Sequence, residues 1–240
     1  MSRLGAAITW LGHAGFHIAT EPAGPVVLVD PWLDNPKAPA NAAELAAQAK
    51  VILVTHGHFD HTASTIALAK ETGATILTTV ELAQELVADG APEAQVVGFN
   101  IGGAAEAHGV RATLVQAFHS SSVTGADGRP REVGTPCGFV IELPNGTVIY
   151  NTGDTGVFGD MALIGELYRP SILMLPIGDF YTMGAKQAAK AVALVDAPHV
   201  IPQHFGTFPG LPGTAEAFLA ALPEAHRGRV LVPEPGVTLR

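Results

Sequence analysis

The sequence predicts a mixed α/β (α+β) fold: a four-layer αββα sandwich with two β-rich halves inside and helices outside. Two observations support this. Strands and helices alternate in the first and last thirds of the chain, whereas residues 95–152 form strands joined by turns. The antiparallel middle argues against an uninterrupted Rossmann array. The 240 residues are 48% hydrophobic and contain no repeat or long linker, so we expect one domain, 1–240.

The first third reads as alternating buried strands and helices. Short apolar runs at 26–29, 51–54 and 74–78 predict buried strands, because such runs have no polar face. Helices are expected at 62–70 and 81–88. Each is followed by a glycine, Gly73 or Gly90, which can end a helix.

The middle and last thirds contain a hairpin and then return to alternation. The Asn145-Gly146 pair lies between apolar runs at 139–143 and 147–150, and this arrangement is typical of a tight β-hairpin. The polar segment 120–135 predicts a long loop, a kind of segment that is usually functional or mobile. The remaining expected elements are strands at 171–176, 199–203 and 230–232 and helices at 185–195 and 215–222.

Four metal-binding side chains follow the expected strand at 51–54 within six residues. His56 and His58 are two residues apart in an extended segment, so both can point to one metal. Asp60 and His61 fall where the chain turns into the next helix and can face a second metal. Gly57 permits a sharp backbone path between the first two histidines.

Three further candidate ligands lie at the ends of expected strands. His119 follows the strand expected at 112–118, Asp154 follows the hairpin, and His204 follows the strand at 199–203. Active-site residues often project from such positions on a rigid scaffold. Each of the three could instead be a capping or merely hydrogen-bonded residue.

The chain resembles the metallo-β-lactamase superfamily from end to end. The residues that match, in the family's order, are the motif His-x-His-x-Asp-His at 56–61, His119, Asp154 and His204. Flanking segments are similar to a narrower branch, the UPF0173 metal-dependent hydrolases, which are similar to ascorbate-phosphate lactonases. These segments are Leu11-Gly-His-Ala14, Asp30-Pro-Trp-Leu33, Gly178-Asp-Phe-Tyr-Thr-Met183 and Pro202-Gln-His-Phe-Gly206.

The resemblance implies an αββα sandwich with two metals held between loops at the strand edges. By family precedent His56, His58 and His119 bind one metal, Asp60, His61 and His204 bind the other, and Asp154 bridges them. The commonest zinc β-lactamases place a cysteine at the position of Asp154. Flavo-diiron members place a glutamate at the position of His58. Members that process nucleic acid carry an inserted clamp domain, for which this chain has no room.

Such a site suits hydrolysis by a metal-bound hydroxide. Two divalent cations, Asp60, Asp154 and a bridging hydroxide sum to about +1, which favours an anionic substrate or transition state. Asp60, Asp154 and His13 are therefore the candidate catalytic residues. Zinc is expected from the imidazole-rich set, although Mn, Fe or Ni could occupy the same ligands.

Residues near the ligands have expected supporting roles. In the resembling family, the turn that contains His13 borders the metals, although a lone loop histidine is more often solvated. Asp30 could orient a ligand histidine through its free ring nitrogen. We expect both to contact ligands without binding metal, because seven ligands suffice for two metals. Tyr181, Thr182 and Met183 precede a helix and are candidates to line the substrate entrance.

The expected function is hydrolysis of an ester-like bond, with a phosphodiester ranked narrowly above a lactone or other carboxylic ester. Alternatives of another class are an iron redox or dioxygenase member and a metal-binding protein without catalysis. The expected partner is a small, anionic substrate, and a homo-oligomer remains open. Arg129 and Arg131 in the 120–135 segment could contact an anion, but solvent exposure is the simpler interpretation.

Composition excludes several other functions. The net charge of −9, with no run of basic residues, argues against a binder of nucleic-acid polymers. No apolar run approaches the ~20 residues that span a bilayer, and no signal peptide is visible. The single Cys137 cannot form an intramolecular disulfide, and we expect it to be a buried structural residue. A cytoplasmic location follows as an expectation.

Overall fold

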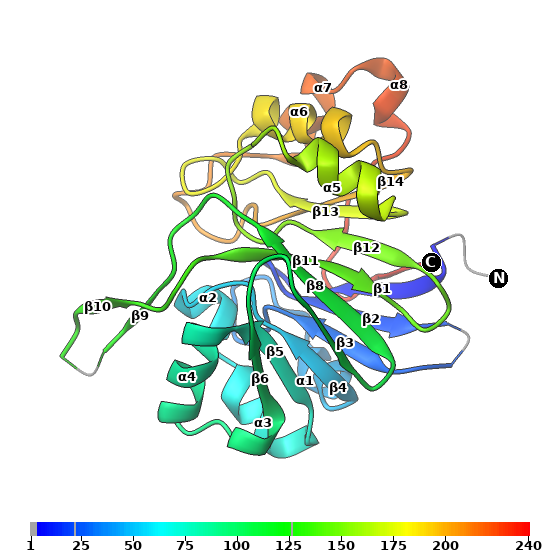
Figure 1. Ribbon diagram of the computed structural model, residues 1–240. Helices are drawn as coiled ribbons and strands as arrows, with labels where there is room; N and C mark the ends of the chain where they lie inside the picture. Colours follow the sequence, from blue (N-terminus) through cyan, green and yellow to red (C-terminus); the bar gives the residue numbers. More distant parts are fainter. Residues whose placement is uncertain (1–3, 22, 126) are drawn as a thin grey trace.

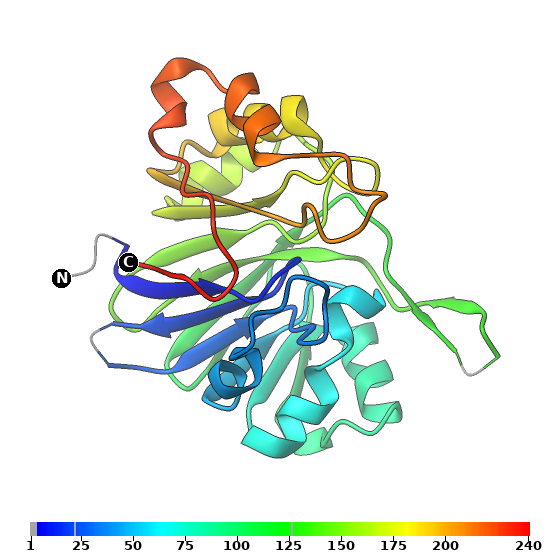
Figure 2. The same cartoon turned by 180° about the vertical axis from the view of Figure 1, so that it is seen from behind.

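Two β-sheets pack face to face and helices cover their outer faces (Figures 1 and 2). The computed structural model describes residues 4–21, 23–125 and 127–240. One sheet has seven strands in the order β15-β1-β2-β3-β4-β5-β6. The other has six, in the order β14-β13-β12-β11-β8-β7. The predicted αββα sandwich is therefore confirmed.

The seven-stranded sheet changes from antiparallel to parallel where helices begin to separate its strands. β1 to β3 are joined by short turns and pair antiparallel, whereas β3 to β6 pair parallel. The strands are Ala6–Trp10 (β1), Phe16–Thr20 (β2), Val26–Val29 (β3), Ala49–Leu53 (β4), Thr75–Thr79 (β5), Val96–Phe99 (β6) and Thr238–Leu239 (β15). The helices are Ala42–Ala46 (α1), Phe59–Thr62 (α2), Thr65–Thr72 (α3), Val80–Ala88 (α4) and the short 3₁₀ helix Glu93–Gln95 (η1).

The six-stranded sheet contains the predicted hairpin. β11 and β12 pair antiparallel around Gly146, whose φ of +86° suits glycine in this tight turn. The strands are Ala104–Ala107 (β7), Val110–Gln116 (β8), Cys137–Glu142 (β11), Val148–Asn151 (β12), Ile172–Pro176 (β13) and His199–Gln203 (β14). The helices are Met161–Tyr168 (α5), Ala185–Val195 (α6), Ala215–Ala221 (α7) and Glu224–Arg227 (α8).

The main hydrophobic core lies between the two sheets. Ile8, Phe16 and Ile18 from β1 and β2 belong to one buried cluster with Phe139 and Ile141 of β11. A second cluster lies between the seven-stranded sheet and its helices, and it contains Leu28, Ile52 and Leu82. Because parallel strands such as β4 are covered on both faces, they read as continuous apolar runs. Cys137 is fully buried, as predicted.

Two expectations about irregular segments were wrong. Within 120–135, Ser122–Thr124 (β9) and Pro130–Glu132 (β10) pair antiparallel and form an arm that leaves the body of the molecule (Figure 1). Pairing satisfies backbone groups that a loop would leave to water. Residues 230–232 form no strand and contribute only a bridge from Val230 to Val200. Pro233 follows directly and cannot donate a ladder hydrogen bond, and the last strand is instead β15.

The helix expected at 62–70 is divided into α2 and α3, and α3 ends at Gly73 in the left-handed conformation, as predicted. The short helices α1, α5 and α8 were not anticipated. No helix in the described ranges is long and apolar enough to cross a membrane.

Candidate metal centre

The predicted ligands meet at one edge of the sandwich, beyond the carboxyl ends of four strands. Residues 56–61 follow β4 and enter α2, and His204 directly follows β14. His119 and Asp154 each lie three residues beyond the end of their strands, β8 and β12, rather than at the strand ends. Side chains separated by up to 148 positions in the sequence thus share one site.

Two groups of side chains with no member in common, and a third that overlaps both, could each hold a metal ion. His56, His58 and His119 each offer one ring nitrogen, and these three atoms lie within 4.8 Å of one another. His56 Nε2 lies 2.9 Å from His58 Nδ1. A second group under the same criterion contains His13, Asp60, His61 and His204, and a third joins His56, His61 and Asp154.

Asp154 lies between the two groups. Its Oδ2 atom is 2.9 Å from His204 Nε2, 3.3 Å from His61 Nε2 and 3.7 Å from His119 Nε2. Burial alone would raise the pKa of Asp154, but the adjacent His204 and His61 hold it well below its ordinary value. The carboxylate is therefore ionised and central among the imidazoles.

Asp60 is the second carboxylate at the centre, and it is partly buried. Burial opposes its ionisation, but His61 and the hydrogen bond from His13 hold its pKa below the ordinary value. Burial likewise works against a charged His61, yet Asp154, Asp30 and Asp60 raise its pKa well above the usual range. A buried and a partly buried carboxylate side by side require compensating positive charge, which protons on histidine or divalent cations can supply.

The donor set fits divalent transition metals. Neutral imidazole and carboxylate are the ligands that zinc, manganese and iron share. Asp154 Oδ1 and His61 Nε2 are buried and have no hydrogen-bond partner among the described residues. Buried polar atoms rarely lack a partner, and an ion between the two ligand groups would provide one.

Asp30 and Thr55 orient two of these histidines from behind. Asp30 accepts hydrogen bonds from the Thr55 backbone N–H (2.8 Å), the Thr55 hydroxyl (2.8 Å) and His61 Nδ1 (2.8 Å). Because the Thr55 hydroxyl donates to Asp30, it can only accept from His56 Nδ1, at 2.9 Å. Both histidines then present Nε2 to the centre. Thr55 was not anticipated, and its only signal is its place directly before His56.

His13 contacts Asp60 and Thr207. Its Nε2 atom lies 2.9 Å from Asp60 Oδ2 and its Nδ1 atom 3.0 Å from the Thr207 hydroxyl. Burial lowers the pKa of His13 to about 4, outweighing the hydrogen bond to Asp60 that raises it. The ring is therefore uncharged at neutral pH; because the ionised Asp60 can only accept, Nε2 carries the single N–H and Nδ1 accepts from the Thr207 hydroxyl.

Three site residues other than glycine adopt left-handed backbone conformations. The φ angles are +53° at His13, +43° at Asp30 and +54° at His204. Such angles are uncommon for residues with a Cβ and cluster at functional sites. Gly57, by contrast, is not among the residues with positive φ. Its hydrogen is needed because a Cβ there would collide with the Val133 side chain.

A cavity of about 580 Å³ opens over the ligands. Phe59, Tyr181 and Phe208 form aromatic parts of its wall, and among the described residues no lysine or arginine lines it. Of the three residues expected at the entrance, only Tyr181 lines this cavity. Met183 is fully buried in the main core, and Thr182 does not line the cavity. Phe59 and Phe208 were not anticipated.

The two arginines of the arm do not line this cavity. Arg131 pairs with Glu85 on α4, and Arg129 lies 4.0 Å from the exposed Asp127. Contact of Arg129 and Arg131 with an anion, the alternative to solvent exposure, therefore has no support at the metal centre.

Comparisons with known proteins agree with this geometry. The family described as "Beta-lactamase superfamily domain" matches residues 26–205. A UPF0173 metal-dependent hydrolase of Herpetosiphon aurantiacus is 46% identical over 231 residues, which cover 95% of both chains. One from Myxococcus xanthus is 46% identical over 96% of this chain and 82% of its own.

Solved structures show the same fold. Igni18, a metallo hydrolase from Ignicoccus hospitalis, is 33% identical, with a TM-score of 0.84 over 98% of this chain and 97% of its own. CmlA, a diiron β-hydroxylase from Streptomyces venezuelae, is 13% identical, with a TM-score of 0.71 over 100% of this chain and 55% of its own. The latter likeness concerns the fold alone. From its sequence, its fold and its clustered histidines and aspartates, the chain belongs to the β-lactamase superfamily and, within it, to the UPF0173 metal-dependent hydrolases.

Proposed function

We propose that this hydrolase cleaves an ester-like bond at a centre of two divalent cations. The observation that carries the proposal is the position of Asp154. One of its oxygens lies within 4 Å of His61, His119 and His204, so a single carboxylate reaches both ligand groups. A carboxylate between two imidazole clusters is suited to bridging two metals.

The proposed ligands divide into two sets and a bridge. His56, His58 and His119 would hold one cation, Asp60, His61 and His204 would hold the other, and Asp154 would connect them. Zinc is the first choice for so many imidazoles, and Mn, Fe and Ni are alternatives with the same donors. When bound, two divalent cations supply an activated water at neutral pH and polarise the bond under attack.

The chain's own residues prepare this centre for reaction. The low pKa values of Asp60 and Asp154 keep both ionised at neutral pH, so neither carboxyl group has to lose a proton when metal binds. We propose that His13 acts on Asp60 by holding its carboxylate through the 2.9 Å contact, rather than as an eighth ligand. Asp30 has the same role toward His61.

The cavity wall bears on the choice of substrate. Because no lysine or arginine lines it, recognition of negative charge depends on the metal centre itself. A phosphodiester carries one negative charge, which matches the net charge of about +1 expected for the loaded centre. We therefore retain phosphodiester above lactone. Phe59, Tyr181 and Phe208 offer apolar surface to the organic groups of either substrate.

The test is hydrolysis by reconstituted protein. Metal-free protein is loaded with Zn²⁺ or Mn²⁺ and assayed with bis(p-nitrophenyl) phosphate beside a lactone panel. Phosphodiesterase activity should appear with metal and disappear in Asp154→Ala. Asp89→Ala, an exposed aspartate at the end of α4, is the matched control and should remain active.

Other results would change the conclusion. Turnover of lactones alone would reverse the ranking of substrates. Full metal loading without hydrolysis of any ester would favour a metal-binding protein without catalysis. Binding of a single equivalent of metal by active protein would contradict the dinuclear centre.

A further inference from the structure

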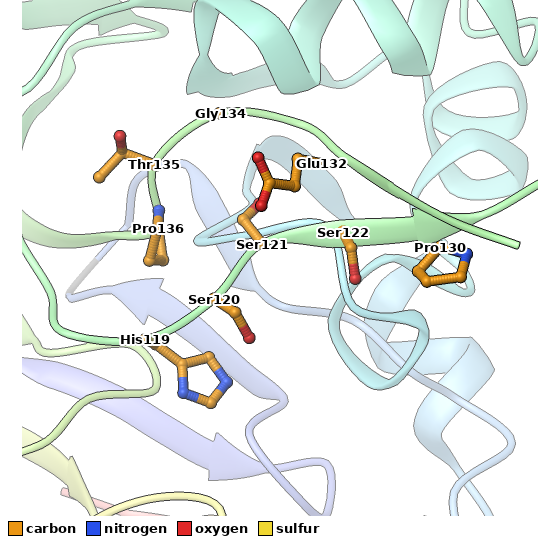
Figure 3. A pocket seen from close by; sticks show the side chains of 9 residues that line it. All are labelled: His119, Ser120, Ser121, Ser122, Pro130, Glu132, Gly134, Thr135 and Pro136. Carbon is orange, nitrogen blue, oxygen red and sulfur yellow. The ribbon is translucent and has the colours of Figure 1, made fainter.

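A second cavity adjoins the metal centre on the other side of segment 119–122 (Figure 3). It also measures about 580 Å³, and it lies between this segment and residues 130–136. His119, Ser120 and Ser122 line both cavities. A molecule whose reacting bond lies at the metal ligands can therefore extend into this second space, which we call the Glu132 cavity.

Hydroxyl groups and one carboxylate dominate the wall of the Glu132 cavity. Its polar lining side chains are His119, Ser120, Ser121, Ser122, Glu132 and Thr135. The Ser121 hydroxyl is already engaged, since it accepts from the Gly57 backbone N–H and lies 3.5 Å from the Val133 carbonyl. The Ser120 hydroxyl lies 3.4 Å from His58 Nε2. Ser122, Thr135 and Glu132 remain as groups that could meet a ligand.

The charge in this cavity is negative. No lysine or arginine lines it, and Arg131, adjacent to Glu132 in sequence, pairs with Glu85 instead. Behind the wall, the side chain of Glu81 packs so closely against Gly134 that a Cβ there would lie 2.7 Å from its carboxylate. Glu81 of α4 therefore adds a second carboxylate beside this wall, and no ion pair among the described residues engages it.

Glu132 itself is uncommitted. Within 4–21, 23–125 and 127–240, no ion pair or hydrogen bond engages its side chain. Figure 3 shows its carboxylate directed into the space between the two segments, on the side of Thr135 and Pro136. An ionised carboxylate accepts hydrogen bonds and cannot donate them.

We propose that the Glu132 cavity binds the part of the substrate beyond the bond that is cleaved, and that this part donates hydrogen bonds and carries no negative charge. Hydroxyl and ammonium groups share this chemistry. The inference rests on the proposed hydrolytic function. It adds that the two ends of the substrate differ, with an anionic reacting group at one end and hydrogen-bond donors at the other. The reacting group lies at the cationic metal centre, and the hydrogen-bond donors lie at Glu132, across His119 and Ser120.

The selectivity would arise because the Glu132 carboxylate interacts differently with the chemical groups that a substrate could place beside it. A hydroxyl or ammonium group satisfies Glu132 with a charge-assisted hydrogen bond, whereas an alkyl group leaves it unpaired and a carboxylate repels it. Loss of one hydrogen bond to a charged group corresponds to about 10- to 100-fold in binding. Because Glu132 is exposed to solvent, we expect an effect at the lower end of this range, about 10-fold.

The experiment uses four p-nitrophenyl phosphodiesters on the metal-loaded protein. Their second ester group is propyl, 2,3-dihydroxypropyl, 3-aminopropyl or 2-carboxyethyl. We expect kcat/KM for the dihydroxypropyl or aminopropyl ester to exceed that of the propyl ester about 10-fold, mainly through KM, and the carboxyethyl ester to be the poorest. The two favoured arms distinguish hydroxyl from ammonium as the preferred donor.

Variants assign the preference to the cavity. Glu132→Ala should abolish the advantage of the donor-bearing esters, so that their kcat/KM falls to that of the propyl ester. Glu106→Gln, an exposed glutamate on β7, is the control and should keep the preference. Equal use of all four esters, or preference for the carboxyethyl ester, would overturn the inference.

A binding measurement separates this inference from the proposed function. Calorimetric titration compares 2,3-dihydroxypropyl phosphate with propyl phosphate on wild-type protein and on Glu132→Ala. Tighter binding of the hydroxylated compound that depends on Glu132 would support the cavity assignment even where no diester is hydrolysed. Absence of turnover would count against the phosphodiesterase proposal, whereas equal binding of the two phosphates would count against the Glu132 cavity.

Discussion

Replacing Thr55 by valine should weaken both the fold and one metal site, although Thr55 is not a ligand. Thr55 is fully buried, and valine has nearly its shape but no hydroxyl. The change removes a 2.8 Å hydrogen bond to Asp30 and leaves His56 Nδ1 without its acceptor at 2.9 Å. Each loss costs about 1–3 kcal/mol. Because the two bonds share one oxygen, we expect the free energy of unfolding of the metal-free protein to fall by about 2–4 kcal/mol.

Metal affinity should fall as well, since His56 loses the contact that fixes its tautomer. Disrupting such contacts typically costs about 10- to 100-fold in affinity. Urea denaturation of metal-free protein measures stability, and competition with a chromophoric chelator for Zn²⁺ measures affinity. Thr55→Ser, which keeps the hydroxyl, is the control. If Thr55→Val and Thr55→Ser lost equal stability and bound zinc equally well, the orienting role of the hydroxyl would be refuted.

Three further predictions concern single positions. His13→Ala should retain near-normal metal content by elemental analysis while turnover falls, and loss of a full equivalent of metal would identify His13 as a ligand. Burial lowers the pKa of His17, so the unfolded chain binds a proton more readily below pH ~6.5, and the free energy of unfolding should decline as the pH falls. His17→Phe should reduce that decline in denaturation curves recorded at pH 7.5 and 5, and an unchanged slope would contradict the assignment. Gly153→Ala should cost about 2–4 kcal/mol in the same measurement, because φ is +60° and a Cβ would lie 2.5 Å from the Cys137 carbonyl. Gly146→Ala, with a φ of +86° and open space around it, should cost only about 1–2 kcal/mol, and equal costs would show that packing at Gly153 does not matter.

Local sequence patterns predicted most of the regular structure. The helix over Ala185–Val195 and the strand over His199–Gln203 have the bounds expected from their apolar spacing. The arm of β9 and β10 was read as a loop because its strands have three residues each, too few to show an alternating pattern. Residues 230–232 show the opposite error, since Pro233 follows this apolar run and only the bridge from Val230 to Val200 forms.

The candidate site was predictable where its residues are close in sequence and less so where the fold alone joins them. His56 to His61 form a compact motif, and the structure brings His119, Asp154 and His204 to it. Thr207 contacts His13 across 194 positions, and nothing in the local sequence indicates such a partner. Met183 was placed at the entrance from its position before a helix. That reasoning could not supply the direction of the side chain. In the structure the Met183 side chain is buried in the core.

The left-handed backbone at His13, Asp30 and His204 has a consequence for attempts to engineer a hardier protein. Each position costs about 1–2 kcal/mol relative to glycine, which adopts such angles freely. Glycine at Asp30 would leave three buried donors without an acceptor, which costs more than the strain it relieves, so a screen for heat resistance in the metal-free chain would keep this aspartate. Glycine at His13 or His204 would give a more relaxed chain, but it would remove the proposed support of Asp60 or a proposed metal ligand.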